Sequence, residues 1–237
     1  MKLVFGASLL LLAACSVPAP VTPAAAPLRG EGQGPVAAPL PDPHLSAGDI
    51  REIADLIAET QRVIGLPAFE RNLRAVEAEF GLIRQSRAGR ELSAAMIADL
   101  YAGRDPRYRF RPVMVGWNSS ESTSITREGG TILLATNVRD RWRLGTVRSR
   151  ALAINSLAHE FAHTLSRGPA EANIDFVFTD GGSLLGWFSR RAPVATYTIG
   201  TVAQCTFLEE QMALRGSLFD CMRRYGLSSF RTYGDDG

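Results

Sequence analysis

The sequence predicts an α+β domain with a small mixed sheet. Apolar residues at helical spacing occupy 46–103, short extended runs follow over 104–136, and one long helix is predicted over 145–168. The 237-residue chain has a net charge of only +2 and is 46% hydrophobic. A chain of this length and composition can bury a sizeable core.

An export signal is predicted at the N-terminus. Residues 1–14 combine the basic Lys2 with an apolar run that is too short to span a bilayer as a mature helix. Leu12-Ala13-Ala14-Cys15 resembles the lipobox of bacterial lipoproteins, in which the cysteine thiol is acylated. The resemblance implies a lipid anchor on Cys15 and a location facing the periplasm or the cell surface. An ordinary secretory signal with an incidental cysteine is the alternative.

Residues 15–45 are predicted to form a tether. Proline and alanine dominate this stretch, and no apolar period runs through it. Such a composition favours extended polyproline conformations and cannot bury a core. We therefore expect the folded domain to cover residues 46–237, about 190 residues, which is within the usual size of one domain.

Three helices are predicted in the first part of this domain, over 46–103. Ser46 is a candidate N-cap of the first helix, and Pro67 is suited to begin the second. Each helix has its own apolar stripe, and glycines separate the three. The stripes are Ile50, Ile53, Ile57 and Ile64, then Phe69, Leu73, Val76 and Phe80, then Leu92, Met96 and Leu100, with breaks at Gly65, Gly81 and Gly103.

Short strands are predicted next, over 108–115 and 125–136, with a turn at 128–130. Arginine and aromatic residues are interleaved over 104–111 and 139–150, a combination that can bind nucleic acid. All but one of the 26 basic residues of the chain are arginine, however, wherever they occur. We interpret both stretches as solvated strand faces and expect no nucleic-acid partner.

The residues that carry chemistry lie on the helix predicted over 145–168. His159 and His163 are one turn apart, so they share a helix face with Cβ atoms about 5 to 6 Å apart. Two imidazoles at this spacing can hold one tetrahedral metal ion. Glu160 lies about 100° around the helix from His159, where its carboxylate can act on a metal-bound water instead of binding the metal. The alternative is that the two histidines are unrelated polar or core residues that bind no metal.

A separate stripe of the same helix faces the core. Thr146 is its predicted N-cap, and Gly168 followed by Pro169 is its predicted end. The apolar residues of the stripe are Val147, Ala151, Ile154, Ala158, Phe161 and Leu165.

The sequence His-Glu-Phe-Ala-His at 159–163 is an instance of H-E-x-x-H and resembles the zincin superfamily of zinc metallopeptidases. The longer metzincin motif needs Gly at position 166 and His at position 169, where this chain has Ser166 and Pro169. The remaining histidine, His44, lies in the proline-rich stretch. The resemblance therefore points to a carboxylate as third ligand, as in the gluzincins.

In gluzincins this ligand often stands on a second helix, in a pattern E-x-x-[AS]-D. A helix is predicted from Cys205 to about Tyr225, and residues 210–213 fit the first four positions, whereas Leu214 replaces the aspartate. The resemblance implies Glu210 as third ligand. The other carboxylate candidates are Glu209 and, in the preceding connection, Glu171, Asp175 and Asp180.

Two cysteines remain after Cys15, an even number that suits an exported protein. In one straight helix Cys205 and Cys221 would be about 24 Å apart, beyond disulfide reach. A bridge therefore requires a bend, for which Gly216-Ser217 is the candidate. Free buried cysteines are the alternative.

The resemblance implies a zinc-dependent peptidase of the cell envelope, more an endopeptidase than an exopeptidase. Zn²⁺ would be held by His159, His163 and Glu210, and Glu160 would be the general base. Tyr197 is either a donor to a developing oxyanion or a structural tyrosine. The expected partners are a protein or peptide substrate and the membrane. The alternatives are a catalytically silent zincin-like binding or assembly lipoprotein and a structural lipoprotein without metal.

Overall fold

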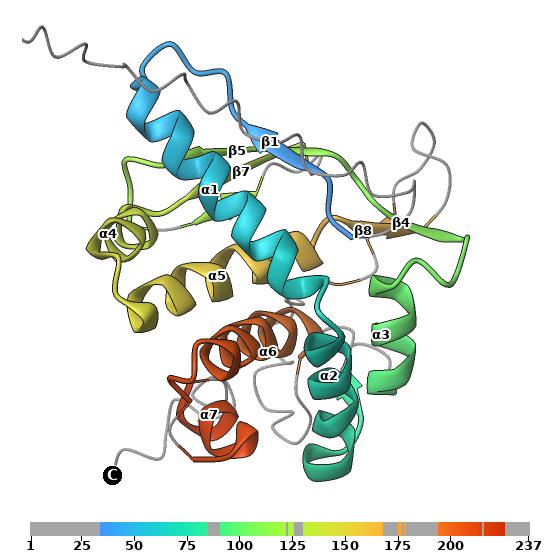
Figure 1. The fold of residues 1–237 in the computed structure, drawn as a ribbon. Helices are drawn as coiled ribbons and strands as arrows, with labels where there is room; N and C mark the ends of the chain where they lie inside the picture. The colour runs from blue at the N-terminus through green and yellow to red at the C-terminus, as the bar shows by residue number, and fades with distance from the viewer. Residues whose placement is uncertain are drawn as a thin grey trace, which may run out of the picture.

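The fold is α+β, as predicted (Figure 1). The computed structural model describes residues 34–84, 91–121, 123–125, 130–167, 175–176, 178, 194–214 and 216–225. The predicted signal, Cys15 and the first part of the predicted tether lie outside these residues. No helix in the described ranges combines the length and the apolar character needed to cross a bilayer.

The main sheet has four strands in the order β1-β5-β7-β6. The first three are parallel to one another, and β6 is antiparallel to β7. A second, antiparallel sheet has the order β4-β8-β9, and β2 and β3 form a separate antiparallel pair. The strands are β1 (Ala37–Pro39), β2 (Ile83–Arg84), β3 (Glu91–Leu92), β4 (Tyr108–Phe110), β5 (Val113–Trp117), β6 (Ser124–Ile125), β7 (Thr131–Leu134), β8 (Leu165–Arg167) and β9 (Asp175–Phe176).

Strand β1 lies within the stretch predicted as a tether. The Val113 amide donates to the Val36 carbonyl at 3.0 Å, and the Leu40 amide donates to the Val115 carbonyl at 2.6 Å. Pro39 has no amide hydrogen, but proline is tolerated in an edge strand such as this one. The extended conformation of the proline-rich segment is thus used for strand pairing, and ordered structure begins before residue 46.

The first two helices begin where the sequence predicts. In α1 (Ala47–Ile64) Ser46 and Asp49 form a reciprocal capping box, and α2 (Pro67–Phe80) starts at its proline. The third helix, α3 (Ala94–Tyr101), differs from its prediction because Leu92 belongs to β3 and Met96 is 52% exposed. Its buried face consists of Ala94, Ile97, Ala98 and Tyr101.

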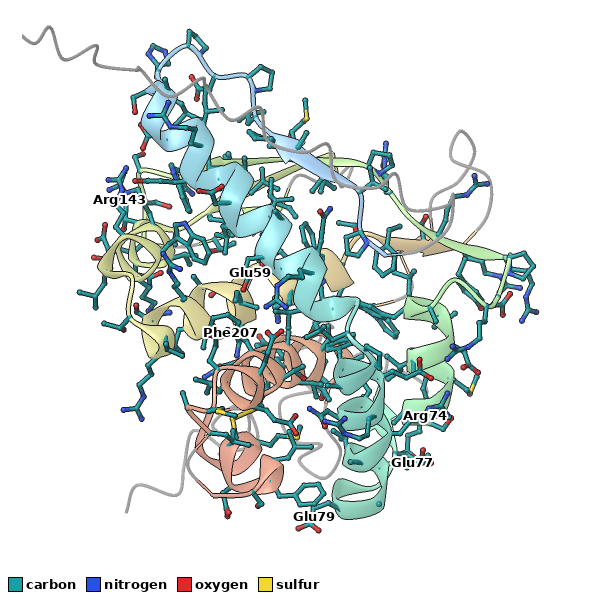
Figure 2. All side chains as sticks on the ribbon, in the orientation of Figure 1. Glu59, Arg74, Glu77, Glu79, Arg143 and Phe207 are labelled. Atoms are coloured by element: carbon teal, nitrogen blue, oxygen red, sulfur yellow. A yellow bond between two sulfur atoms is a disulfide. The ribbon has the colours of Figure 1, made fainter. Side chains whose placement is uncertain are left out.

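The second arginine-rich stretch, 139–150, is helical: 139–144 belong to α4 (Thr136–Leu144) and 147–150 begin the next helix, so the prediction of a strand face there is wrong. Val138 and Trp142, four residues apart, are its buried residues. Arg143, which is labelled in Figure 2, pairs with Asp49 and Glu52 of α1, at 2.7 and 2.8 Å. In the other arginine-rich stretch Arg109 is exposed on β4, as predicted.

The central helix is α5 (Val147–Ala162), and the Thr146 hydroxyl accepts from the Ser149 amide as its predicted N-cap. It ends earlier than the predicted boundary at Gly168. The Thr164 hydroxyl donates to the Phe161 carbonyl at 2.8 Å, and Leu165 pairs with Phe110 of β4. Pairing with a distant strand therefore replaces the last helical turn, although Leu165 is buried as expected.

Helix α6 (Ala195–Glu210) begins ten residues before the predicted start at Cys205. Nearly all of its residues from Ala195 to Leu208 are buried, and Figure 1 shows it beside α5, with the main sheet beyond α5. A short turn with positive φ at Met212 and Gly216 separates α6 from α7 (Leu218–Tyr225). The single helix predicted here is thus two helices.

This turn allows the disulfide between Cys205 and Cys221, whose Cα atoms are 5.9 Å apart (yellow bond in Figure 2). Of the two alternatives left by the sequence, the bridge across a bend is confirmed.

Loss of this disulfide is expected to lower the free energy of unfolding by about 3 kcal/mol, because it closes a loop of about 15 residues in the unfolded chain. Urea denaturation with and without reductant measures the effect. The Cys205→Ala/Cys221→Ala variant should match the reduced protein and should not respond to reductant. Equal stability of the reduced and oxidised proteins would contradict the expectation.

Candidate metal centre

The two histidines of the motif come together at the C-terminal end of α5. Their Nε2 atoms are 3.3 Å apart, and their ring centroids are 5.0 Å apart with planes at 76°. Two nitrogens that each lie about 2.0 to 2.1 Å from a tetrahedral zinc ion are themselves about 3.3 to 3.4 Å apart. His159 and His163 therefore have the separation that two ligands of one zinc ion require.

The orientation of His163 is fixed by a backbone carbonyl. Its Nδ1 lies 3.2 Å from the carbonyl oxygen of the fully buried Phe178. Since a carbonyl can only accept, Nδ1 carries the hydrogen, and in the neutral ring Nε2 keeps its lone pair. This is the tautomer that binds metal through Nε2, and a carbonyl partner on the other nitrogen is a common feature of metal-binding histidines.

His159 contacts helix α6. Its ring centroid is 4.6 Å from that of Tyr197, with the planes tilted by 57°. Further back along α5, the Asn155 side-chain amide donates to the Gln204 side-chain oxygen at 2.6 Å. Later residues of α5 thus meet earlier residues of α6, so the two helices run antiparallel.

Gly200 is a point of close approach between these helices. A Cβ added there would lie 2.8 Å from the Asn155 carbonyl oxygen and 3.2 Å from the Cβ of His159. Only a residue without a side chain fits this position. The absence of a Cβ therefore lets the backbone of α6 lie directly against the turn of α5 that carries the metal motif.

Glu160 lies beside the histidines on the same last turn of α5 and is partly buried. Its position in the chain places it on a different side of the helix from His159. It can therefore act as a base near a metal held by the two rings without being a ligand itself.

The structure does not bring Glu210 to the histidines. Because α6 runs antiparallel to α5 and meets His159 at Gly200, Glu210 lies ten residues further on, about 15 Å along the helix. Both oxygens of Glu210 accept from Arg62, and this guanidinium lowers the pKa of the carboxyl. The Glu209 carboxylate accepts hydrogen bonds from the Arg71 guanidinium and from the Asn72 side-chain amide, each at 3.0 Å.

The carboxylates of the connection before α6 are only partly described. Glu171 and Asp180 lie outside the described residues, and Asp175 of β9 pairs through its backbone with Arg167 of β8. Among the residues that the structure describes, no group of three or more His, Cys, Asp or Glu side chains could hold a metal ion. Within those residues the centre consists of two histidines.

Three contributors to this centre were not found from the sequence. A glycine inside a helix is a signal of close packing, and Gly200 could have been found that way. Asn155 lies one helical turn before His159, so the sequence places it on the same face of the helix. This position does not predict which residue of α6 it contacts. The Phe178 carbonyl has no sequence signal, because every residue has a backbone carbonyl.

Removal of the Glu210 carboxylate is expected to leave metal affinity nearly unchanged, because this group pairs with Arg62 at the far end of α6. Zinc titration of Glu210→Ala and Glu209→Ala against a chelating indicator measures this. A sharp loss of affinity in Glu210→Ala alone would restore it as third ligand, and a loss in Glu209→Ala alone would shift the assignment by one residue. Glu171→Ala and Asp180→Ala complete the series.

No family model, curated protein sequence or solved structure matches this chain.

Proposed function

We propose that this chain is a zinc-dependent peptide-bond hydrolase of zincin type that acts at the cell envelope. The observation that carries the proposal is the 3.3 Å separation of the His159 and His163 Nε2 atoms at the end of a helix bearing H-E-x-x-H. The hydrogen bond of His163 to a buried carbonyl adds to it, because it selects the tautomer that binds metal.

The chemistry follows from the residues present. His159 and His163 would hold the ion, which when bound would lower the pKa of a water molecule and polarise the scissile carbonyl. Glu160 would accept the proton of the attacking water and pass it to the leaving amine. His163 must keep its proton on Nδ1 throughout, and the Phe178 carbonyl favours that state.

Location at the envelope is part of the proposal. The Cys205–Cys221 disulfide supports it, because such bonds persist in oxidising compartments outside the cytosol. The lipobox-like segment ending at Cys15 would supply a lipid anchor. We expect Cys15→Ser to shift the protein from the detergent phase to the aqueous phase or to block its processing.

A second candidate function is a catalytically silent zincin-like module that binds a partner in the envelope. It is favoured by one observation, that Glu210 pairs with Arg62 and does not approach the histidines. If the two described histidines were the whole ligand set, the centre would hold metal weakly and would leave more coordination positions open than a peptidase requires.

Metal analysis of the purified mature protein tests the proposal. We expect one zinc ion per chain in the wild type and loss of zinc in His159→Ala and His163→Ala, because each variant removes one of the two described ligands. The control is His44→Ala, which alters an exposed histidine that is far from His159 and His163 in the sequence. Wild-type protein that binds no zinc after incubation with the ion would refute the metal centre.

A further inference from the structure

We infer that Tyr197 is a positioning residue for His159, and that its aromatic ring holds the imidazole so that Nε2 faces Nε2 of His163. This inference deepens the proposed metal centre and rests on it. It assigns to helix α6 a part in building the centre, although α6 brings no described carboxylate to it.

The contact is between rings. The centroids of Tyr197 and His159 are 4.6 Å apart, a separation within the range of favourable aromatic pairs, and the ring planes are tilted by 57°. Tyr197 is partly buried, and Thr196 and Thr198 on either side of it are buried. The first turn of α6 is therefore held in the interior, and the ring is presented from a fixed backbone.

Each of the two histidines has a described contact that restrains its ring. His163 has a directional hydrogen bond to the Phe178 carbonyl, which fixes both its ring orientation and its tautomer. The terminal torsion of a histidine side chain is broad and roughly two-fold, so an imidazole without packing on its face samples several orientations. The Tyr197 ring limits that freedom for His159.

Close helix packing makes the contact possible. Gly200 lies three residues after Tyr197, on the same face of α6, and lets the two backbones approach at Asn155. The Asn155–Gln204 hydrogen bond joins the two helices one turn further along α6. Tyr197, Gly200 and Gln204 thus contact α5 on three successive turns of α6. These contacts together fix the rotation of α6 about its axis.

This role depends on the ring of Tyr197 and not on its hydroxyl group. Tyr197→Phe keeps the ring and removes the hydroxyl, whereas Tyr197→Ala removes both. A tyrosine that donates to an oxyanion would show the opposite pattern, since Tyr197→Phe would then lower kcat without changing metal affinity. The pair of variants separates positioning from transition-state stabilisation.

The test uses the full chain and Zn²⁺ or Co²⁺ as probe. Metal affinity should fall about 10-fold or more in Tyr197→Ala, by analogy with loss of other groups that orient ligands, and should change less than about 3-fold in Tyr197→Phe. The visible absorption of the Co²⁺ form should change in Tyr197→Ala and be restored in Tyr197→Phe. Tyr108→Ala, a tyrosine truncation on β4, is the matched control and should change neither.

A second readout does not need metal. Two-bond ¹H–¹⁵N spectra of the metal-free chain report the tautomers of His159 and His163, and only the tautomer populations of His159 should change in Tyr197→Ala. Unchanged affinity and unchanged His159 tautomer populations in a folded Tyr197→Ala protein would overturn the inference, as would an equal loss of affinity in Tyr197→Phe. If wild-type protein binds no metal, the proposed function fails, and the His159 tautomer populations still decide whether Tyr197 restrains the ring.

Discussion

Replacement of Glu160 by glutamine is expected to lower peptide cleavage by about 10²- to 10⁴-fold and to leave zinc content unchanged. Glutamine has nearly the same shape as glutamate but cannot accept a proton from water at neutral pH. In the proposed mechanism Glu160 is the base and not a ligand, so the fold and the metal should be retained. The loss should therefore appear in kcat.

The measurement compares cleavage of a broad peptide library by wild-type and Glu160→Gln protein at equal zinc occupancy. Glu121→Gln, the same change at an exposed position, is the control and should keep full activity. Equal rates for wild-type and Glu160→Gln protein would remove Glu160 from the mechanism. If both proteins rescue a deletion strain equally, the silent binding module becomes the better account of the biological role.

Local features of helix α5 were predictable from the sequence. Its N-cap needs only a threonine followed three residues later by a free amide, and the spacing of His159 and His163 follows from 3.6 residues per turn. Both depend on residues within one or two turns of each other. The end of the helix was not predictable, because the pairing of Leu165 with Phe110 joins residues 55 apart in the sequence.

The start of α6 was missed because its residues are buried on all sides. Polar residues of α6, four threonines and Gln204 among them, are buried together with its apolar residues, so no 3.6-residue apolar period separates a core face from a solvent face. The threonines, isoleucine and valine of this segment also favour strands when considered alone. Tertiary burial overrides that propensity. The assignment of Glu210 as a ligand depended on where α6 begins and on its direction relative to α5. Neither can be predicted from the residues of α6 alone.

Strand β1 and helix α4 were missed for a similar reason. The proline-rich segment has no apolar period, and its pairing with β5 is decided by a strand about 75 residues away. In α4 only Val138 and Trp142 are buried, too few to show a period among the arginines. In both elements the deciding contacts are to distant parts of the chain.

Replacement of Gly200 by alanine is expected to destabilise the protein by about 1 to 3 kcal/mol and to weaken metal binding. Inside a helix this change ordinarily stabilises by about 1 kcal/mol, because alanine has the higher helix propensity. Here the new Cβ would lie 2.6 Å from the Asn155 side-chain oxygen and 2.8 Å from its backbone carbonyl oxygen. The side chain can rotate away, but the backbone cannot, so the two helices must separate.

The matched control is Gly48→Ala in the first turn of α1, where the added Cβ would meet only the Ser46 hydroxyl at an ordinary 3.4 Å. Urea denaturation should show Gly48→Ala equal to or slightly more stable than wild type and Gly200→Ala clearly less stable. Separation of α6 from α5 also withdraws Tyr197 from His159, so zinc affinity should fall in Gly200→Ala and not in Gly48→Ala. A Gly200→Ala protein with wild-type stability and wild-type zinc affinity would show that close contact between α5 and α6 is not required at this centre.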